Sequence, residues 1–197
     1  MFVIPQHGMA FGHCAALCSK FHCLNMSVLN VHERILDASL SEVASLVDGL
    51  ASDEDALWPF DRWPAMKFDR PLGVGAAGGH GPIRYLVESY EPGSKVCFRF
   101  KGPKGFVGQH RFEIAQIAKG KVRLQHTIEM RTIGSARLTW PLVYRPLHNA
   151  LIEDALDRAE SYVGGGPKKR EWSLWVKVLR WLVSRSRPFT QRRKATA

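Results

Sequence analysis

Two long stretches of alternating apolar and polar residues, 106–117 and 121–133, lie a few residues apart and constrain the fold more than any other feature. Alternation with a period of two predicts strands with one buried face, and the link at Lys119-Gly120 is short enough for a hairpin. Shorter strand patterns occur elsewhere, and connections such as Glu91-Pro92-Gly93 favour antiparallel pairing. The further predicted strands are 28–37, 66–70, 83–90 and 95–100.

Helices are predicted on both sides of this strand region. Ser39 and Glu42 form the pattern of a capping box, and apolar residues follow at helical spacing as far as Leu50. A second, shorter helical turn is predicted over 52–58, ended by Pro59. The long helix is predicted over 146–163, with the residues facing the core being Leu147, Leu151, Ala155, Ala159 and Tyr162. The residues facing water are predicted to be Asn149, Glu153, Asp157 and Glu160. The order of elements indicates an α+β protein without a parallel βαβ repeat.

Three short stretches resemble a known superfamily when they are taken with this order of elements. They are Arg-Pro-Leu-Gly-Val-Gly at 70–75, Gly-Pro-Ile-Arg-Tyr-Leu-Val-Glu-Ser-Tyr-Glu-Pro-Gly at 81–93, and Trp-Pro-Leu-Val-Tyr-Arg-Pro-Leu at 140–147. Over residues 28–163 the chain resembles the START-like (SRPBCC) superfamily, and within it the polyketide cyclase/dehydrase-like branch. The resemblance implies a helix-grip fold (START/Bet v 1-like), a curved antiparallel sheet wrapped around a long C-terminal helix. It also implies a cavity for an apolar or amphipathic small molecule, but it supports a fold better than an activity.

The long hairpin places two histidines on one apolar face. A turn centred near Ala118 and Lys119 sets Phe112 opposite His126 and His110 opposite Ile128, so the two imidazoles become diagonal neighbours. Imidazoles can act as general acid and base on an enolisable polyketone, the chemistry that the resemblance implies for cyclases. They can equally anchor a ligand by hydrogen bonds or be ordinary buried histidines. The catalytic residues therefore stay unknown, with His110 and His126 as candidates.

Further side chains are expected at the same cavity, although each of them could instead be ordinary core packing. The predicted ligand-binding residues are Tyr85, His110, Phe112, His126, Ile128, Tyr144, His148 and Leu151. The glycines at 73, 75 and 78 match a dinucleotide fingerprint, but the Gly-His-Gly-Pro that follows cannot open a helix. We expect a flexible loop there, at the mouth of the cavity.

The C-terminal segment is strongly basic, whereas the rest of the chain is close to neutral. Residues 164–197 hold ten Lys and Arg against one acidic residue, Glu171. Between 172 and 187 polar residues recur every three to four positions opposite a wide apolar face, which predicts an amphipathic helix lying on an anionic membrane. A stretch of twelve residues interrupted by two charges is too short to cross a bilayer. The predicted membrane-binding residues are Trp172, Trp175, Lys177, Arg180 and Trp181.

Two alternatives remain open for this helix: it packs on the body of the protein, or it binds a protein partner. Nucleic acid is not expected as a partner, because a phosphate-binding arm has no use for three tryptophans beside aliphatic residues.

The N-terminal residues contribute no site to this prediction. Cys14, Cys18 and His22 lack the usual spacing of a zinc knuckle, and no secretory signal precedes them, so no metal or cofactor is expected and the cytoplasm is the expected compartment. Residues 1–25 are expected to be an unstructured extension, 26–163 the ligand-binding domain, and 164–197 a linker and membrane-surface tail. The predicted function is binding of a hydrophobic small molecule (a lipid, quinone or polyketide-like compound) at the periphery of a membrane. The alternatives are a cyclase/dehydrase and a protein-interaction module, and the oligomeric state is not predicted.

Overall fold

The computed structural model describes residues 26–166 and 170–185. The predicted N-terminal extension, its cysteines and the basic clusters at 168–169 and 192–194 lie outside the described residues. Within them, seven antiparallel strands form one sheet, in the order β1-β7-β6-β5-β4-β3-β2. In that order the strands are β1 (Met26–Asp37), β7 (Lys121–Thr132), β6 (Phe106–Ala118), β5 (Lys95–Gly102), β4 (Ile83–Glu91), β3 (Ala77–His80) and β2 (Lys67–Phe68).

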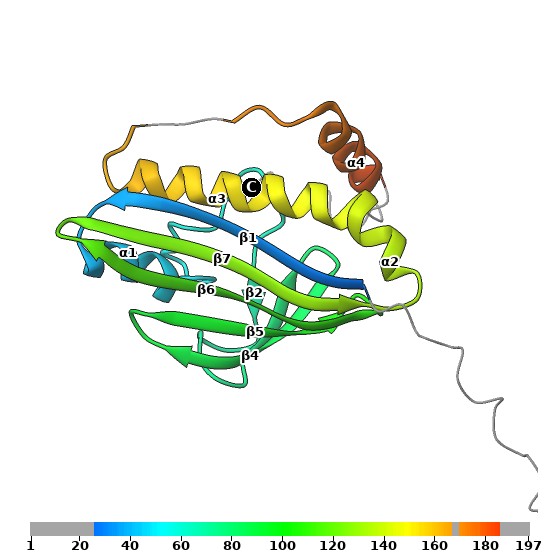
Figure 1. Cartoon of the computed structure of the whole chain (residues 1–197), viewed down its shortest axis with the longest axis horizontal. Coiled ribbons are helices and arrows are strands. Elements are labelled where there is room, and N and C mark those ends of the chain that lie inside the picture. Colours follow the sequence, from blue (N-terminus) through cyan, green and yellow to red (C-terminus); the bar gives the residue numbers. More distant parts are fainter. Residues whose placement is uncertain (1–25, 167–169, 186–197) are drawn as a thin grey trace, which may run out of the picture.

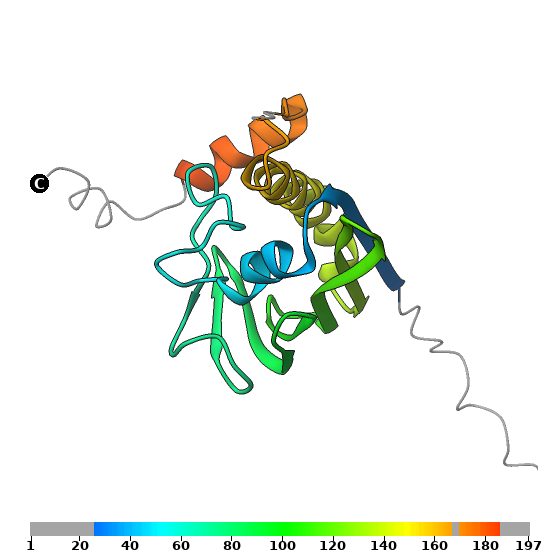
Figure 2. The same cartoon turned by 90° about the vertical axis from the view of Figure 1, so that its left-hand side faces the viewer.

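The sheet curves around the long helix α3 (Arg145–Tyr162), which runs along its concave face (Figure 1). In the perpendicular view, α1 (Leu40–Asp48) and the segment between α1 and β2 close the side left open by the strands (Figure 2). The last helix, α4 (Leu174–Arg185), packs beside α3. The predicted α+β helix-grip architecture is confirmed.

The register of the long hairpin is the predicted one. His110 is paired with Ile128 and Phe112 with His126 across β6 and β7. Because directly opposite residues share a face, both imidazoles lie on the concave side, toward α3. The alternation of the two strands thus places the histidines inside the fold.

The start of α1 is also as predicted, but the short helix expected after it is absent from the structure. Ser39 and Glu42 form the capping box in both directions. Residues 52–58 form turns instead of a helix, because the carboxylate of Asp55 accepts the backbone N–H groups of Ala51, Leu57 and Trp58. A side chain that satisfies the local donors removes the need for helical hydrogen bonds.

The helical region before and within α3 differs from the prediction in two respects. It begins earlier, with α2 (Ala136–Thr139) and a π-helical turn η1 (Trp140–Tyr144), and α3 starts at Arg145. The predicted faces are also partly wrong, since Tyr162 is 56% exposed and Asp157 is buried. Arg34 from β1 and Arg170 pair with the Asp157 carboxylate, so an ion pair lies where water was expected.

The predicted loop over the glycine-rich stretch is wrong at its C-terminal end. Gly78 belongs to β3, which pairs with both β2 and β4. A Cβ atom at Gly78 would lie 2.0 Å from the carbonyl oxygen of Lys67, so the close approach of β2 requires glycine there. The glycines allow strand pairing rather than a nucleotide site.

Candidate ligand-binding site

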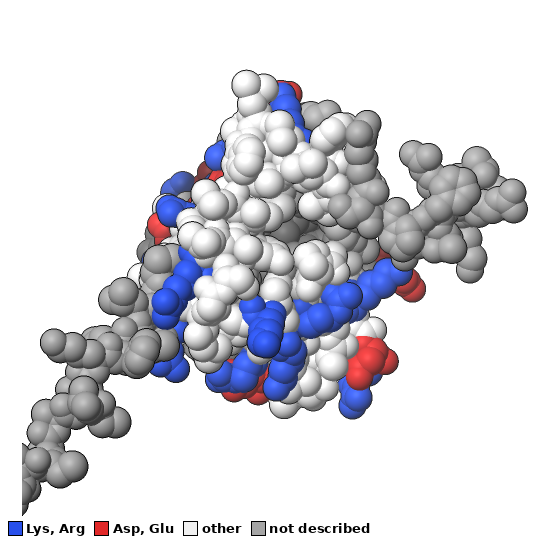
Figure 3. Space-filling model, turned by 90° about the vertical axis from the view of Figure 1, so that its right-hand side faces the viewer, with Lys and Arg blue, Asp and Glu red and all other residues white. Residues whose placement is uncertain are grey.

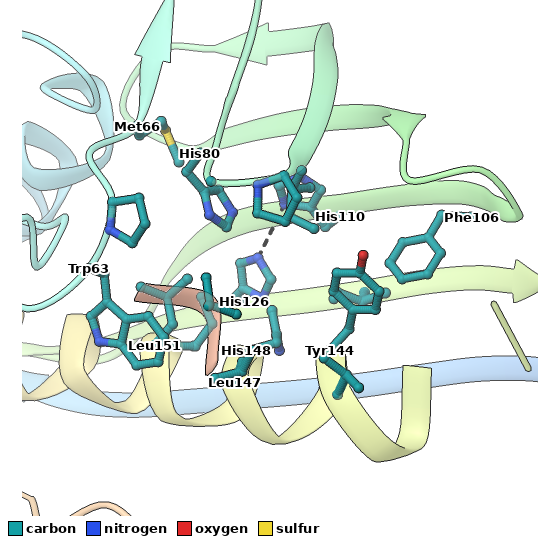
Figure 4. Close-up of a pocket in the computed structure, with 18 of the residues that line it drawn as sticks. Trp63, Met66, His80, Phe106, His110, His126, Tyr144, Leu147, His148 and Leu151 are labelled. Atoms are coloured by element: carbon teal, nitrogen blue, oxygen red, sulfur yellow. Dashed lines mark hydrogen bonds between the residues drawn. The ribbon is translucent and has the colours of Figure 1, made fainter. Parts of the chain in front are cut away.

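A cavity of about 290 Å³ lies between the concave face of the sheet and α3. Its wall is mostly aromatic and aliphatic, with histidines among the apolar side chains (Figure 4). The predicted ligand-binding residues that line it are His110, Phe112, His126, Ile128, Tyr144, His148 and Leu151. Tyr85 does not line it: the ring is fully buried and packs against His80, Phe98 and His110.

Several lining residues were not singled out from the sequence. His80 lines the cavity from β3. The sequence of this strand is rich in glycine and therefore predicted a loop. Phe106 shares the inward parity of His110 and could have been added from alternation alone. Trp63 and Met66 come from the loop before β2 and Trp140 comes from η1, where no period marks the inward side. Phe100 comes from β5.

Three histidines form what we call the histidine strip: His110 on β6, His126 on β7 and His148 on α3. His110 Nδ1 lies 3.3 Å from His126 Nε2, within hydrogen-bonding distance (Figure 4). The rings of His126 and His148 are 5.0 Å apart between centroids. The remaining nitrogens of the strip, namely His110 Nε2, His126 Nδ1 and both nitrogens of His148, are buried and have no hydrogen-bond partner within the described residues.

Burial keeps these imidazoles neutral. Loss of hydration lowers the pKa of His148 to about 3 and the pKa of His80 to about 4. The pKa of His110 and of His126 lies well below the usual value. Burial is the larger cause, and repulsion from the charge that neighbouring histidines would carry is the smaller one. At neutral pH the histidines of the wall therefore act as uncharged donors and acceptors.

The side of the cavity next to α4 is built differently, around a set of residues that we call the mouth cluster: Arg62, Trp63, Asp154, Trp172 and Arg180. Of these, Trp63 and Arg180 line the cavity. The buried Asp154 carboxylate accepts hydrogen bonds from Arg62 (2.6 Å), Trp63 (2.6 Å) and Trp172 (3.0 Å). The Arg180 guanidinium lies 4.3 Å from the ring centroids of both Trp63 and Trp172 and donates to the carbonyl oxygen of Arg62. These contacts dock α4 on the body, with Arg180, Val183 and Ser184 lining the cavity.

The side of α4 that faces away from the body is apolar as well. Leu174 is 81% exposed and Val178, one turn later, is 44% exposed. Trp175 donates its indole N–H to the carbonyl oxygen of Leu142 in η1, so this surface is continuous with the turn before α3. The end of the molecule that carries α2 and α4 shows an uncharged area bordered by Lys and Arg (Figure 3).

The structure divides the predicted membrane-binding residues between these two sides. Trp172 and Arg180 belong to the mouth cluster and contact the protein body. Trp175, Lys177 and Trp181 are exposed, and Lys177 pairs with Glu171. Among the described helices, none has both the length and the apolar character needed to cross a bilayer.

Metal chemistry finds no support at the cavity. Over residues 26–166 and 170–185, no three His, Cys, Asp or Glu side chains are grouped so as to hold a metal ion. Cys97, the free thiol on β5, is buried, and burial raises its pKa. Among the described lining residues, the polar side chains are the imidazoles, the Tyr144 and Ser184 hydroxyls, the Arg180 guanidinium and the indoles of Trp58, Trp63 and Trp140.

Comparison with known proteins identifies the architecture. No protein-family model matches the chain, and no curated protein matches its sequence. Among solved structures, norcoclaurine synthase from Thalictrum flavum, in complex with dopamine and hydroxybenzaldehyde, is similar at 13% identity with a TM-score of 0.55, covering 80% of this chain and all of that one. CalU16 from Micromonospora echinospora is similar at 13% identity with a TM-score of 0.52, covering 86% of this chain and 95% of that one.

The chain has the Bet v 1-like fold. A protein from Thermobifida fusca shares this fold at 11% identity and a TM-score of 0.54, covering 73% of this chain and 99% of its own. At these identities the likeness extends to the Bet v 1-like architecture and not to an activity. The function must therefore be argued from the cavity and from α4.

Proposed function

We propose that this Bet v 1-like protein binds a hydrophobic small molecule, such as a lipid, quinone or polyketide-like compound, at the surface of an anionic membrane. The observation that carries the proposal is the cavity itself, about 290 Å³ with an aromatic and aliphatic wall and a few converging polar groups. That composition is typical of small-molecule sites. Norcoclaurine synthase, which has a similar fold, was solved in complex with dopamine and hydroxybenzaldehyde, and this supports a small-molecule ligand.

The membrane part of the proposal rests on the exposed side of α4. Leu174, Trp175 and Val178 present apolar area next to the cavity mouth, where a bilayer would bury it. The excess of basic residues over 164–197 adds attraction to anionic headgroups. With α4 docked, membrane contact would hold the cavity mouth toward the bilayer, where a hydrophobic ligand is dissolved.

A polyketide cyclase or dehydrase is the second candidate, and the contact between His110 and His126 favours it. A general base works best when its pKa lies near the operating pH. Burial lowers the pKa of both imidazoles well below that value, which makes them weak bases at neutral pH. The electrostatics of the histidine strip thus favour binding over proton abstraction.

Sedimentation with vesicles tests the membrane part. The full chain is mixed with vesicles of phosphatidylcholine and phosphatidylserine, and a Leu174→Ser/Val178→Ser variant is compared with a Leu29→Ser/Val31→Ser variant. Leu29 and Val31 are 69% and 46% exposed on β1, which makes them a matched control for loss of exposed apolar area. We expect the α4 variant to lose most of its sedimentation and the β1 variant to retain it.

Organic extraction of the purified full chain, followed by mass spectrometry, tests the ligand part. A co-purifying lipophilic compound in near-stoichiometric amount supports the proposal. Failure of the wild-type chain to sediment at low salt contradicts the membrane part and leaves a protein partner as the reason for the exposed face of α4. Turnover of an added polyketone, abolished by His110→Phe, would instead establish the enzyme.

A further inference from the structure

The contact between His110 and His126 restricts where their protons can lie. Each neutral imidazole carries one N–H, and the contact between His110 Nδ1 and His126 Nε2 holds one hydrogen. If His110 donates, its Nε2 is bare and His126 Nδ1 carries hydrogen. If His126 donates, His110 Nε2 carries hydrogen and His126 Nδ1 is bare. We call these two atoms, which lie outside the contact, the outer nitrogens. In both arrangements the pair offers one donor and one acceptor.

The protein does not satisfy these two outer nitrogens. His110 Nε2 and His126 Nδ1 are buried without a partner within the described residues. Apolar rings pack against both histidines: Phe98 stacks on His110 at 4.9 Å, and Phe112 meets His126 edge-on at 4.6 Å. An unsatisfied buried polar group destabilises the folded state, so both nitrogens favour a ligand that supplies the missing hydrogen bond.

The charge of the wall restricts the ligand further. Of the described residues that line the cavity, Arg180 alone has a permanent charge, and it belongs to the mouth cluster, where it contacts two indole rings. A carboxylate on the ligand would enter this wall without a countercharge beside the histidine strip, at a high desolvation cost. Protonating an imidazole to compensate is unfavourable, since burial already lowers the pKa of His110 and of His126.

We infer that the His110–His126 pair recognises an uncharged ligand through a carbonyl or hydroxyl oxygen, and that the pair adopts whichever tautomer the ligand requires. This inference rests on the proposed binding function and names the ligand class. A ketone oxygen accepts a hydrogen bond from the outer nitrogen that carries hydrogen. A phenol donates a hydrogen bond to the outer nitrogen that does not. The same site can therefore hold a carbonyl compound and its hydroxyl counterpart without a change of charge.

Four bicyclic probes of similar size test the inference: tetralin, 1-tetralone, 5,6,7,8-tetrahydro-1-naphthol and 5,6,7,8-tetrahydro-1-naphthoate. Calorimetric titration of the full chain at pH 7.5 should show the ketone and the phenol binding about three- to tenfold more tightly than tetralin, the gain of one hydrogen bond. The carboxylate should bind more weakly than tetralin. In His110→Phe the tighter binding of the ketone and of the phenol should vanish while tetralin still binds. A Leu29→Ser control, changed at an exposed position of β1, should behave as wild type.

Nitrogen-15 spectra of the histidine rings provide a second readout that does not depend on affinity. The ketone and the phenol should shift the tautomer populations of His110 and His126 in opposite directions, with both rings neutral. Equal binding of all four probes with unchanged tautomers would overturn the inference and leave the proposed binding function standing. Tightest binding by the carboxylate would also overturn it, and failure of every probe including tetralin would overturn the binding function itself.

Discussion

The histidine strip and the mouth cluster handle buried polar groups in opposite ways. In the mouth cluster the buried Asp154 carboxylate receives three hydrogen bonds, and the Arg180 guanidinium is enclosed by two indole rings. In the histidine strip four ring nitrogens are buried without a partner within the described residues. The mouth cluster supplies the hydrogen bonds of its own buried carboxylate. The histidine strip lacks hydrogen-bond partners for its four ring nitrogens within the described residues.

The difference separates a structural role from a functional one. Completed polar networks hold elements in place, and here they attach α4 to the body beside the cavity. Unpartnered polar groups cost stability, and proteins retain such costs where a ligand or a reaction needs them. Changes in the two regions should therefore alter the free energy of unfolding with opposite signs.

Acid should produce the largest effect, and it acts on the histidines. The unfolded chain binds protons on its histidines below about pH 6.5, while the folded chain resists protonation until about pH 4 at His80 and about pH 3 at His148. The contribution of the neutral histidines to the free energy of unfolding should thus be at its highest above pH 6.5. It should fall as the pH drops from there, by up to about 1.4 kcal/mol per pH unit for each such histidine.

Urea unfolding between pH 7.5 and 4.5 measures this slope. The raised pKa of Asp154, caused by burial, acts in the opposite direction, since the native state then binds that proton more tightly than the unfolded chain does. A His80→Phe/His148→Leu variant should show a shallower slope. A free energy of unfolding of the wild type that is constant from pH 6.5 to 5 would contradict the claim that the buried histidines stay uncharged in the folded protein.

Removal of the Asp154 carboxylate should have the next largest effect. Asp154→Ala leaves Arg62 and two indole N–H groups without their shared acceptor, so we expect a loss of about 3 kcal/mol in the free energy of unfolding. Asp154→Asn keeps one acceptor oxygen and should lose less. Chemical denaturation measures both, and an alanine variant as stable as wild type would show that the mouth cluster contributes little.

Substitution of His148 should have the smallest effect on the free energy of unfolding, and it should raise it. His148→Leu removes two buried nitrogens that lack partners and places a better helix former in α3, so we expect a gain of about 1 kcal/mol. Tetralone binding should weaken in the same variant. A clear loss of stability would indicate that His148 is satisfied in the folded protein, and the contrast between the two regions would then fail.

The candidate site was predictable from the sequence where a regular strand carries it. His110, Phe112, His126 and Ile128 lie on two long strands joined by a short turn, so their alternation set both the inward face and the register. His80 was missed, because the glycines around it in β3 signal a loop when pairing with β2 and β4 is unknown. The turns at 52–58 were missed for a similar reason, since the carboxylate of Asp55 competes with helical hydrogen bonding.

The sequence by itself determined the order of strands and helices, the inward histidines and a C-terminal helix, because side-chain periodicity and capping act over a few residues. The helix-grip architecture was implied by the resemblance to the START-like superfamily. Only the tertiary structure decided which face of α4 meets the protein. The docking of Trp172 and Arg180 depends on Trp63 and Asp154, which lie far from them in the chain and have no local signal. Tertiary packing likewise decided which histidine nitrogens are left without partners, because satisfaction of a buried polar atom depends on everything packed around it.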